Sequence, residues 1–441
     1  MKHAAVVIVG AGWAGLACAV ELSRQGRPVI LLESARQPGG RARRAPFGSL
    51  RVDNGQHLLM GACHETLRLM HLVGVDTAQA LRRLPFDLHV VGGGEALHLK
   101  APALPAPLHM AAALLTARGL SVGERLAALR CAAALTRLRL AEADDLPLGD
   151  LLQRYRQSPR LQRLLWAPLA QAILNTPPEH ASSRLMARVL RDAMGRSRHD
   201  SDLLLFRTDL GSAFPDHAID FIERHGGSVR LCSRATGLAL EGQRVSGVAL
   251  QDGTALSADA VVLAVPPYAA LRLLPDQPAL QATASQLRRL DSQPIATIYL
   301  RYPPSVRLPE AMIGLAEGPI QWLFDRALYG QHGLIAAIAG GSPPAVPTDN
   351  TALAAAAADA VNRLLGSTVT PLDHRVIREQ RATFTARPGI DARRPGHATP
   401  LAGLWLAGDH TATGYPATLE GAVRSGVECA RYLLQSDNGQ P

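Results

Sequence analysis

Three glycines and one acidic residue have the spacing of a turn that binds a dinucleotide. They are Gly10, Gly12 and Gly15, with Glu33 18 residues further on. In such a turn the glycines allow a tight exit from a strand, close approach of the backbone to a pyrophosphate, and close packing of a helix on a sheet. The N-terminal end of the helix binds phosphate. The acid accepts hydrogen bonds from the hydroxyls of a ribose and disfavours a 2′-phosphate. The pattern predicts FAD or NAD(H), and the same turns add three residues to the predicted site: Trp13, Ala14 and Ser34.

The residues around this turn predict the elements that must hold it. Ala5 to Val9 is an apolar run that leads directly into Gly10, and Val29 to Leu32 is a second apolar run that ends at Glu33. An apolar helical pattern lies between them. Glycines at this spacing also occur in turn-rich loops, but strand, helix, second strand and acid in register favour a parallel α/β nucleotide-binding unit.

Composition limits the classes of protein that remain. The chain has 441 residues, 47% of them hydrophobic and 19% charged, so it can bury a large core in two or more lobes. The net charge of +9 comes with 46 basic residues that are almost all arginine, without a nucleic-acid motif. We therefore expect no nucleic-acid partner, and attraction to an anionic membrane surface instead. No uncharged stretch after the glycine-rich turn reaches the length of a membrane span.

The cysteines indicate a reducing compartment. There are five, an odd number, and they are far apart: Cys18, Cys63, Cys131, Cys232 and Cys429. Such a pattern predicts no disulfide framework and no metal site, and it favours a cytoplasmic location.

A second glycine-rich segment follows the second predicted strand. It reads Gly39-Gly40-Arg41-Ala42. It places flexible backbone and a guanidinium that can pair with phosphate beside the dinucleotide. The segment resembles the second signature of the glutathione-reductase-like flavoproteins, which include amine oxidases and carotenoid desaturases. This resemblance implies that the cofactor is FAD and not free nicotinamide.

The most distinctive segment is Val52 to Gly61, which reads Val-Asp-Asn-Gly-Gln-His-Leu-Leu-Met-Gly. It resembles the squalene-associated desaturases, namely the hydroxysqualene dehydroxylases of bacterial hopanoid synthesis. The resemblance implies that the segment runs along the isoalloxazine side of the pocket, with Gln56 and His57 at the cofactor. From the residues alone, Asp53 and Asn54 could form a turn, and His57 could be a satisfied polar residue on a strand.

Residues 403–426 carry the other half of the expected FAD site. A strand that ends in Gly408 and Asp409 puts a carboxylate at the edge of the sheet, where it can accept hydrogen bonds from the ribityl chain or the pyrophosphate. A helix that starts near Thr418 and Leu419 points its positive end at the flavin pyrimidine. No cysteine follows Asp409 until Cys429, which predicts non-covalent FAD.

The family resemblance also implies a reaction. Hydroxysqualene, an allylic C30 alcohol, would be reduced to squalene with a hydride from N5 of reduced FAD, and a proton donor must lie near the leaving oxygen. We expect His57 to be this donor, with His410 and Tyr415 as alternatives. The family pattern has tryptophan and leucine at these last two positions, so the pocket wall differs here. The superfamily resemblance adds Ala235, near the adenine.

Three other functions fit parts of the pattern. A carotenoid (phytoene-type) desaturase would transfer hydride in the opposite direction on a similar apolar substrate, and the sequence leaves that direction open. An amine oxidase would need a lysine near the flavin, and Lys100 is the only interior lysine. A flavin-binding adaptor would show no substrate-dependent step. The implied partners are a long apolar isoprenoid, an electron donor that the sequence leaves unidentified, and upstream squalene-pathway synthases.

The elements together predict an α/β fold with a discontinuous FAD-binding domain of the glutathione-reductase-like Rossmann type. We assign residues 1–60, 203–268 and 385–435 to this domain, and residues 61–202 and 269–384 to a helix-rich substrate domain. Between residues 226 and 267 the pattern predicts a β-meander that leads back into the parallel sheet. In the substrate domain Gln321, Trp322 and Asp325 line either the cavity or the core.

One predicted helix of the substrate domain is relevant to the question of membrane binding. Residues 124–142 predict a helix with an apolar face of Leu126, Leu129, Ala133 and Leu138 and a basic opposite face. Such a helix could rest on a membrane surface or pack in the core. The first case corresponds to a peripheral location at the inner face of the bacterial cytoplasmic membrane.

Overall fold

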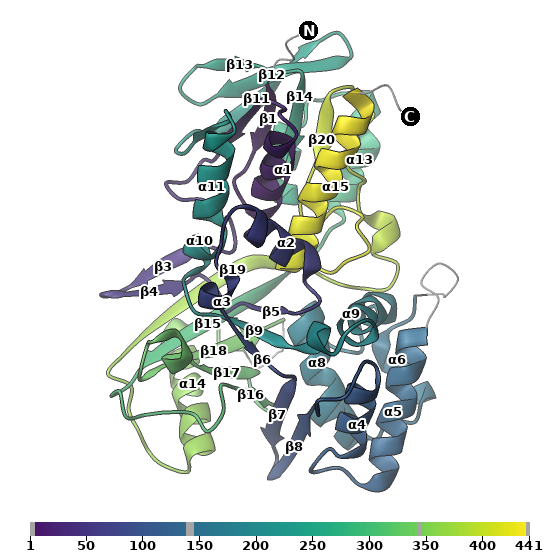
Figure 1. Ribbon diagram of the computed structural model, residues 1–441, viewed down its shortest axis with the longest axis vertical. Helices are drawn as coiled ribbons and strands as arrows, with labels where there is room; N and C mark the ends of the chain where they lie inside the picture. Colours follow the sequence, from purple (N-terminus) through teal and green to yellow (C-terminus); the bar gives the residue numbers. More distant parts are fainter. Residues whose placement is uncertain (1–4, 138–144, 342–345, 438–441) are drawn as a thin grey trace.

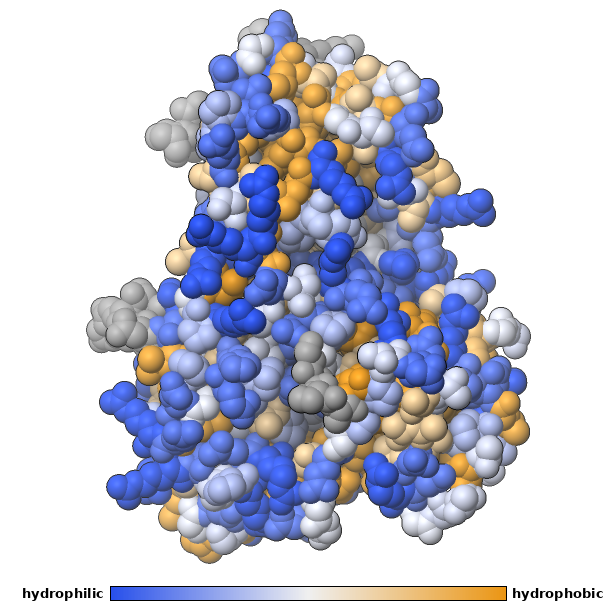
Figure 2. All heavy atoms as spheres, turned by 180° about the vertical axis from the view of Figure 1, so that it is seen from behind, coloured by the Kyte–Doolittle hydropathy of each residue, from blue (hydrophilic) through white to orange (hydrophobic). Residues whose placement is uncertain are grey.

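The structure is a computed structural model that describes residues 5–137, 145–341 and 346–437. Figure 1 shows an upper lobe with a parallel sheet and a lower lobe with a mixed, mostly antiparallel sheet and a group of helices. Seen from behind, hydrophilic residues cover most of the surface, while apolar residues gather on the upper lobe (Figure 2).

The upper lobe is organised by a five-stranded parallel sheet in the order β10-β2-β1-β14-β20. Its first strand, β1 (Val6–Val9), is buried throughout and pairs with its two neighbours in register. Such continuous apolar runs are typical of parallel strands covered on both faces. The other strands are β2 (Val29–Leu32), β10 (Ser228–Arg230), β14 (Ala260–Leu263) and β20 (Leu404–Leu406).

Helices α1 (Trp13–Arg24) and α15 (Leu419–Asp437) lie side by side against this sheet (Figure 1). Their backbones approach closely, because a Cβ at Gly426 would lie 2.1 Å from the carbonyl oxygen of Ala14. The first and last described helices therefore pack as one pair, with α11 (Pro215–Arg224) on the other side of α1.

The predicted meander was partly wrong. Its first strand, β10, joins the edge of the parallel sheet, because Ser228 to Arg230 pair with Ile30 to Leu32. The antiparallel meander instead consists of β11 (Ala235–Glu241), β12 (Arg244–Leu250) and β13 (Ala255–Ser257), and the chain then enters β14.

The lower lobe contains a seven-stranded sheet in the order β19-β15-β18-β17-β16-β7-β8. Its long antiparallel pair, β19 (Asp373–Phe384) and β15 (Ser292–Arg301), rises towards the upper lobe (Figure 1). The remaining strands are β18 (Leu334–Gly340), β17 (Trp322–Asp325), β16 (Met312–Leu315), β7 (Asp87–Gly92) and β8 (Glu95–Lys100), and helix α14 (Asn350–Leu365) packs on β15 and β19.

Helices complete the lower lobe on the side away from α14. Helix α9 (Ser183–Gly195) begins at Ser182, whose hydroxyl oxygen accepts a hydrogen bond from the N–H of Leu185 at 3.0 Å. Its neighbours are α4 (Leu108–Leu115), α5 (Val122–Arg137), α6 (Leu148–Arg154) and α8 (Ala167–Leu174).

The predicted apolar face of the helix at residues 124–142 was partly wrong, since Leu129 and Ala133 are half-buried but Leu126 is not. In α5 the buried residues are Ala128, Cys131 and Leu135, because α4 and α9 pack on that side, and Leu126 is 44% exposed. Residues 138–142 of the predicted helix, including Leu138, lie outside the described residues.

Short elements connect the two lobes. A small sheet joins β5 (Leu58–Met60), β9 (Leu203–Phe206) and β6 (Leu81–Leu84), so residues 203–206 pair with segments on both sides of the predicted boundary at residue 60. Helix α2 (His64–Leu72) packs on α15 of the upper lobe. The remaining connectors include β3 (Arg44–Phe47), β4 (Leu50–Asp53), α3 (Thr77–Ala80), α10 (Leu210–Ala213), α12 (Pro267–Leu273) and α13 (Gln281–Arg288).

Candidate active site

A single cavity of about 1260 Å³ runs from the glycine-rich turns into the lower lobe. It brings together residues that are up to several hundred positions apart in the chain. Gly15 does not line it. All other predicted site residues do: Gly10, Gly12, Trp13, Ala14, Glu33, Ser34, Gly39, Gly40, Arg41, Ala42, Gln56, His57, Ala235, Gly408, Asp409, His410, Tyr415, Thr418 and Leu419.

The upper end of the cavity is a cradle of backbone that only glycine can form. Gly10 has a φ of +107°, and a Cβ there would lie 2.6 Å from the carbonyl oxygen of Ala264. A Cβ at Gly15 would lie 1.9 Å from the carbonyl oxygen of Gly10, so Gly15 acts by packing beneath the cavity. Helix α1 starts at Gly12 without a side-chain cap, which leaves its first N–H groups free for phosphate. The cradle therefore fits a dinucleotide pyrophosphate.

The carboxylate of Glu33 is held by the backbone of both adjoining turns. It accepts hydrogen bonds from the N–H of Ala11 at 2.9 Å and from the N–H of Ala35 at 2.8 Å. The hydroxyl of Ser34 donates a third, longer hydrogen bond at 3.4 Å. A carboxylate has about four acceptor positions, so one remains for a hydroxyl of a ribose. The position predicted from sequence thus fits an adenosine ribose.

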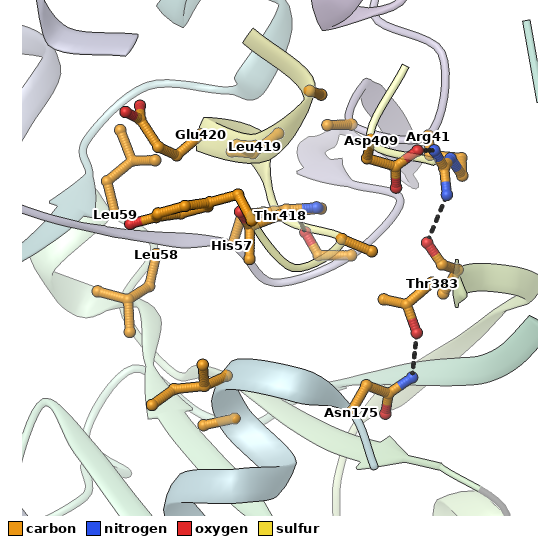
Figure 3. A pocket seen from close by; sticks show the side chains of 18 of the residues that line it. Arg41, His57, Leu58, Leu59, Asn175, Thr383, Asp409, Thr418, Leu419 and Glu420 are labelled. Atoms are coloured by element: carbon orange, nitrogen blue, oxygen red, sulfur yellow. Dashed lines mark hydrogen bonds and ion pairs between the residues drawn. The ribbon is translucent and has the colours of Figure 1, made fainter. Parts of the chain in front are cut away.

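Arg41 and Asp409, which both line the cavity, form an ion pair (Figure 3). Nη2 of Arg41 lies 2.5 Å from Oδ1 of Asp409, and Nη1 donates to the carbonyl oxygen of Ala382 at 2.7 Å. Burial alone would raise the pKa of Asp409, but the charge and hydrogen bond of Arg41, together with the nearby His410, outweigh it and hold that pKa well below the usual range. Arg41 was predicted to pair with phosphate. It also joins strand β19 to the C-terminal edge of β20.

His57 lies at the cavity wall, and its hydrogen bond fixes which nitrogen carries a proton. Nδ1 lies 2.8 Å from the carbonyl oxygen of Gly55, so Nδ1 carries the hydrogen and donates it. Burial, with the nearby charge of Arg41, lowers the pKa of His57. A neutral imidazole of this tautomer presents Nε2 as an acceptor, which does not suit the predicted role of proton donor.

His410 is buried beside Gly408 and Asp409. Its Nδ1 is 3.9 Å from Oδ1 of Asp409, too far for a hydrogen bond, and both ring nitrogens lack a partner among the described residues. Burial lowers its pKa, so the ring is neutral. Unpaired polar atoms in the wall of a cavity are compatible with a bound ligand, which would satisfy them.

Tyr415 is the third predicted candidate and is 4% exposed. The guanidinium of Arg424 lies 4.2 Å from the centre of its ring. Burial raises the pKa of the Tyr415 phenol, so it keeps its proton over the ordinary pH range. Tyr415 therefore carries a hydroxyl proton that it can donate to a group in the cavity. By contrast, the N–H of His57 is already donated to Gly55, and neutral His410 keeps one N–H on its ring.

The loop that carries Gln56 is fixed by residues that the sequence did not single out. Nη1 of Arg326 donates to Oε1 of Gln56 at 2.7 Å, and Nε2 of Gln56 donates to the hydroxyl of Tyr329 at 2.8 Å. Asp53, at the base of this loop, has a pKa raised by burial to about 6. Arg326 is 270 positions from Gln56, so only the folded chain shows this contact.

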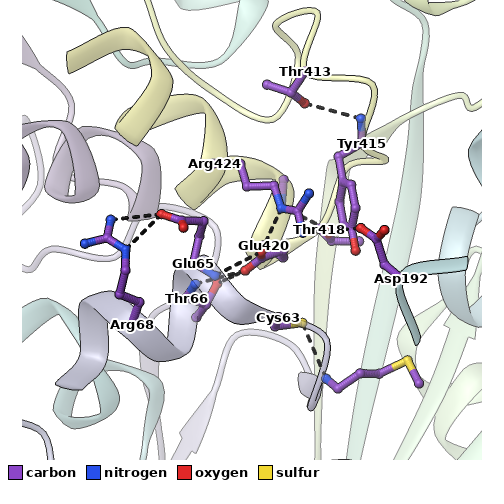
Figure 4. Close-up of polar contacts among 12 residues, drawn as sticks. Cys63, Glu65, Thr66, Arg68, Asp192, Thr413, Tyr415, Thr418, Glu420 and Arg424 are labelled. Atoms are coloured by element: carbon purple, nitrogen blue, oxygen red, sulfur yellow. Dashed lines mark hydrogen bonds and ion pairs between the residues drawn. The ribbon is translucent and has the colours of Figure 1, made fainter. Parts of the chain in front are cut away.

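Glu420 is a second residue that the sequence did not assign a role. Its carboxylate accepts hydrogen bonds from the N–H and the hydroxyl of Thr66 at 2.9 and 2.6 Å, and from Nε of Arg424 at 2.7 Å (Figure 4). It therefore caps α2 with a residue of α15. The motif at residues 416–426 contains Glu420, but the partner on α2 is visible only in the fold.

The lower end of the cavity is apolar with a few amides at one side. Asn175 donates from Nδ2 to the hydroxyl of Thr383 at 3.0 Å (Figure 3). Gln321 and Trp322 line the cavity, which is one of the two places that the sequence left open, whereas Asp325 does not and instead pairs with Arg307. The apolar lining comes from the lower lobe: Phe86, Leu88, Met110, Leu114, Leu129, Leu165, Trp166, Leu169, Ile173, Val189 and Leu190.

Three features are absent from the described residues. Within residues 5–137, 145–341 and 346–437, no group of three histidine, cysteine or acidic side chains is placed to hold a metal ion. Lys100, which an amine oxidase would need near the flavin, has a side chain that is 68% exposed and pairs with Asp87 on the surface of β8. None of the helices described is long and apolar enough to cross a membrane.

A Rossmann sheet whose glycine cradle opens into an apolar chamber defines a dinucleotide-dependent oxidoreductase. The profile of the flavin containing amine oxidoreductases matches residues 13–434, and the chain belongs to this family. It is an FAD-dependent oxidoreductase.

Relatives and solved structures agree with this assignment. Hydroxysqualene dehydroxylase from Rhodopseudomonas palustris is 32% identical, over 97% of this chain and 98% of the relative. That from Sinorhizobium fredii is 30% identical, over 98% and 99%. Zeta-carotene desaturase from Synechocystis sp. is 25% identical, over 97% of each chain. The two hydroxysqualene dehydroxylases confirm the family resemblance that was drawn from Val52 to Gly61.

Two solved structures share the fold. An oxidoreductase from Methanosarcina mazei has a TM-score of 0.75 at 14% identity, over 97% of this chain and 99% of that one. Cyclohexylamine oxidase from Brevibacterium oxydans has a TM-score of 0.71 at 19% identity, over 99% and 100%. At these identities they support the predicted α/β Rossmann fold and nothing finer.

Proposed function

We propose that the protein removes the hydroxyl group of hydroxysqualene reductively and gives squalene. The observation that carries this proposal is the continuous cavity, which joins a dinucleotide cradle to an apolar chamber and has Tyr415 in its wall. The names of two relatives at 30% identity or more support the choice of substrate. A C30 hydrocarbon with one hydroxyl group matches a chamber of this kind.

The residues around the cavity have separate tasks in this reaction. Bound FAD in its reduced form supplies the hydride. The apolar lining from the lower lobe holds the hydrocarbon chain and excludes water. Arg41 and Asp409 fix the wall where the two lobes meet. Tyr415 holds the proton that the departing hydroxyl oxygen must receive, because hydroxide is a poor leaving group.

An anaerobic reaction tests the proposal directly. Reduced protein mixed with hydroxysqualene is expected to give squalene, identified by mass, with one equivalent of flavin reoxidised. The rival function transfers hydride in the opposite direction, from the substrate to the flavin. The relative named zeta-carotene desaturase supports it. The rival function predicts that oxidised protein converts phytoene into a conjugated polyene, seen by its absorbance. The second outcome without the first would replace the proposed function by that of a carotenoid desaturase.

We further propose that the protein takes its substrate from an anionic membrane. Around α4 and α5 five apolar side chains are 40 to 69% exposed: Leu104, Leu108, Leu115, Val122 and Leu126. Arg118 and Arg130 are exposed beside them. The opposite faces of the same two helices line the cavity, so a bilayer at this surface would lie next to the chamber. Contact with upstream squalene-pathway synthases stays a prediction.

Aspartate at two of these positions is expected to release the protein from vesicles. Each exposed apolar side chain contributes about 1 to 2 kcal/mol on entering the bilayer interface, so Leu108→Asp with Val122→Asp should weaken binding to anionic vesicles by about 30-fold or more. Flotation with the vesicles measures this. Leu372→Asp, at a leucine that is 64% exposed elsewhere, is the matched control and should bind normally. Equal binding by all three proteins would contradict the membrane surface.

A further inference from the structure

A second, smaller cavity lies directly behind the wall that contains Tyr415. Its volume is about 290 Å³, which is room for several water molecules, and all but one of its lining residues are charged or histidine. It opens at the exposed residues Arg196 and Arg431. The lining comes from three helices: His64 and Glu65 from α2, Arg188, Asp192 and the adjoining Arg196 from α9, and Arg424, Val427, Glu428 and Arg431 from α15.

The two cavities are separated by one layer of side chains. On α9, Val189 and Ala193 line the large cavity, whereas Asp192 lines the small one. On α15, Ala422 lines the large cavity and Arg424 the small one. This division follows from helix geometry, since residues one or two positions apart point to different sides.

Polar contacts cross this layer. Nη2 of Arg424 lies 3.3 Å from Oδ2 of Asp192, and its guanidinium stacks on the ring of Tyr415 at 4.2 Å. In Figure 4 the carboxylate of Asp192 lies beside the hydroxyl end of Tyr415. Asp192 also pairs with Nε of Arg188 at 3.4 Å. The carboxylate is thus held by two arginines, with the small cavity on one side and the phenol on the other.

The proposed reaction consumes one proton from solvent in each turnover, yet the large cavity is apolar where the hydrocarbon chain would lie. We propose that the small cavity is the entrance for this proton and that Asp192 passes it to Tyr415. This inference rests on the proposed function. Asp192 does not reach the substrate, so it is a positioning and relay residue, and Tyr415 is the donor.

The step balances in atoms and electrons. As the C–O bond of the substrate breaks, the oxygen takes the proton of the Tyr415 hydroxyl and leaves as water, while the carbon takes a hydride with its electron pair. The carboxylate of Asp192 then takes a proton from water in the small cavity and passes it to the phenolate, so that Asp192 returns to its charged form and the water regains its proton from solvent. The charge of Arg424 over the ring stabilises the transient phenolate, whereas the carboxylates of Asp192 and Glu420 and the thiol of Cys63 oppose it. The phenolate therefore recovers its proton readily.

The experiment compares two variants, each of which removes one negative charge from the lining of the small cavity. Asp192→Asn removes the relay, and Glu428→Gln removes a carboxylate that instead faces His397 at 3.3 Å. In a single turnover of reduced holoprotein with hydroxysqualene, flavin reoxidation should slow by about 10-fold to 100-fold in Asp192→Asn and by less than 2-fold in Glu428→Gln. Asp192→Glu, which keeps an acid, should recover most of the rate.

Two readouts separate a relay from a merely structural role. Binding of hydroxysqualene to the oxidised holoprotein, followed by tryptophan fluorescence, should be the same in both variants and the parent. Formate or acetate should restore the rate of Asp192→Ala, because small acids can enter through the rim, but should not restore Tyr415→Phe. Weakened binding, or equal rates in Asp192→Asn and Glu428→Gln, would overturn the relay.

The test also distinguishes the relay from the proposed function. Parent protein that forms no squalene refutes the function, whereas squalene formation that is unaffected in Asp192→Asn refutes only the relay. If Asp192→Asn does not fold, Arg196→Trp narrows the small cavity from its exposed rim. This variant is then expected to slow reoxidation about 10-fold with substrate binding unchanged, and a normal rate would refute the relay.

Discussion

Gly15→Ala is expected to yield a protein that purifies with little or no flavin. The added Cβ would lie 1.9 Å from the carbonyl oxygen of Gly10 and 3.1 Å from Cβ of Ala264, so the turn at Gly10 must move. Forcing an extra carbon into packed structure costs about 1 to 3 kcal/mol. Because the displaced turn is the one that binds the pyrophosphate, this cost appears as about 5-fold to 150-fold weaker FAD binding. Titration of apoprotein with FAD, followed by flavin fluorescence, measures it.

The control is the same substitution where space is available. Gly123 lies in the first turn of α5, and a Cβ there would meet nothing within 4 Å. Gly123→Ala should bind FAD normally and gain about 0.5 to 1 kcal/mol in free energy of unfolding, because alanine favours the helix. Normal flavin content in Gly15→Ala would show that the close contact with Gly10 does not govern the shape of the cradle.

Tyr415→Phe is expected to lower the rate of the chemical step by about 100-fold or more. A positioned proton donor contributes about 10² to 10⁴ in rate, and phenylalanine removes the hydroxyl while it keeps the buried ring. Because Arg424 stacks on the ring face, we expect FAD content and substrate binding to be retained. Rapid-mixing measurement of flavin reoxidation by hydroxysqualene gives the rate.

A second tyrosine in the same cavity provides the comparison. Tyr268 also lines the cavity and lies under an arginine, with the guanidinium of Arg381 at 4.3 Å, but it is 41% exposed. Tyr268→Phe should change the rate by less than 2-fold. If instead His57→Gln abolished the reaction and Tyr415→Phe did not, the donor would be His57, as the sequence first indicated.

The cofactor end of the site was predictable because its chemistry acts through backbone. Gly10 and Gly15 have positions that no other residue type can occupy without a shift of the backbone, and the spacing to Glu33 follows from the lengths of one helix and two strands. The spacing of residues within one short stretch of sequence is therefore enough to predict this end of the site. The same holds for Asp409, which the end of a strand places at the edge of the sheet.

The substrate end was not predictable in the same way. The choice between His57 and Tyr415 depends on a hydrogen bond to the carbonyl oxygen of Gly55 and on the arginine that covers the phenol. The ion pair of Arg41 and Asp409 joins residues 368 positions apart. The face of α5 that is buried depends on α4 and α9. Each of these contacts arises only when distant segments meet.

The pairing of α1 with α15 has a consequence for how the protein is made. The ribosome releases the glycine cradle long before it synthesises Leu419–Asp437, so the nascent polypeptide carries an open half of the nucleotide cleft throughout translation. Flavin capture must wait for the final helix to dock beside the first. Messages that end early should therefore yield colourless chains with an exposed apolar sheet, which are natural clients for chaperones.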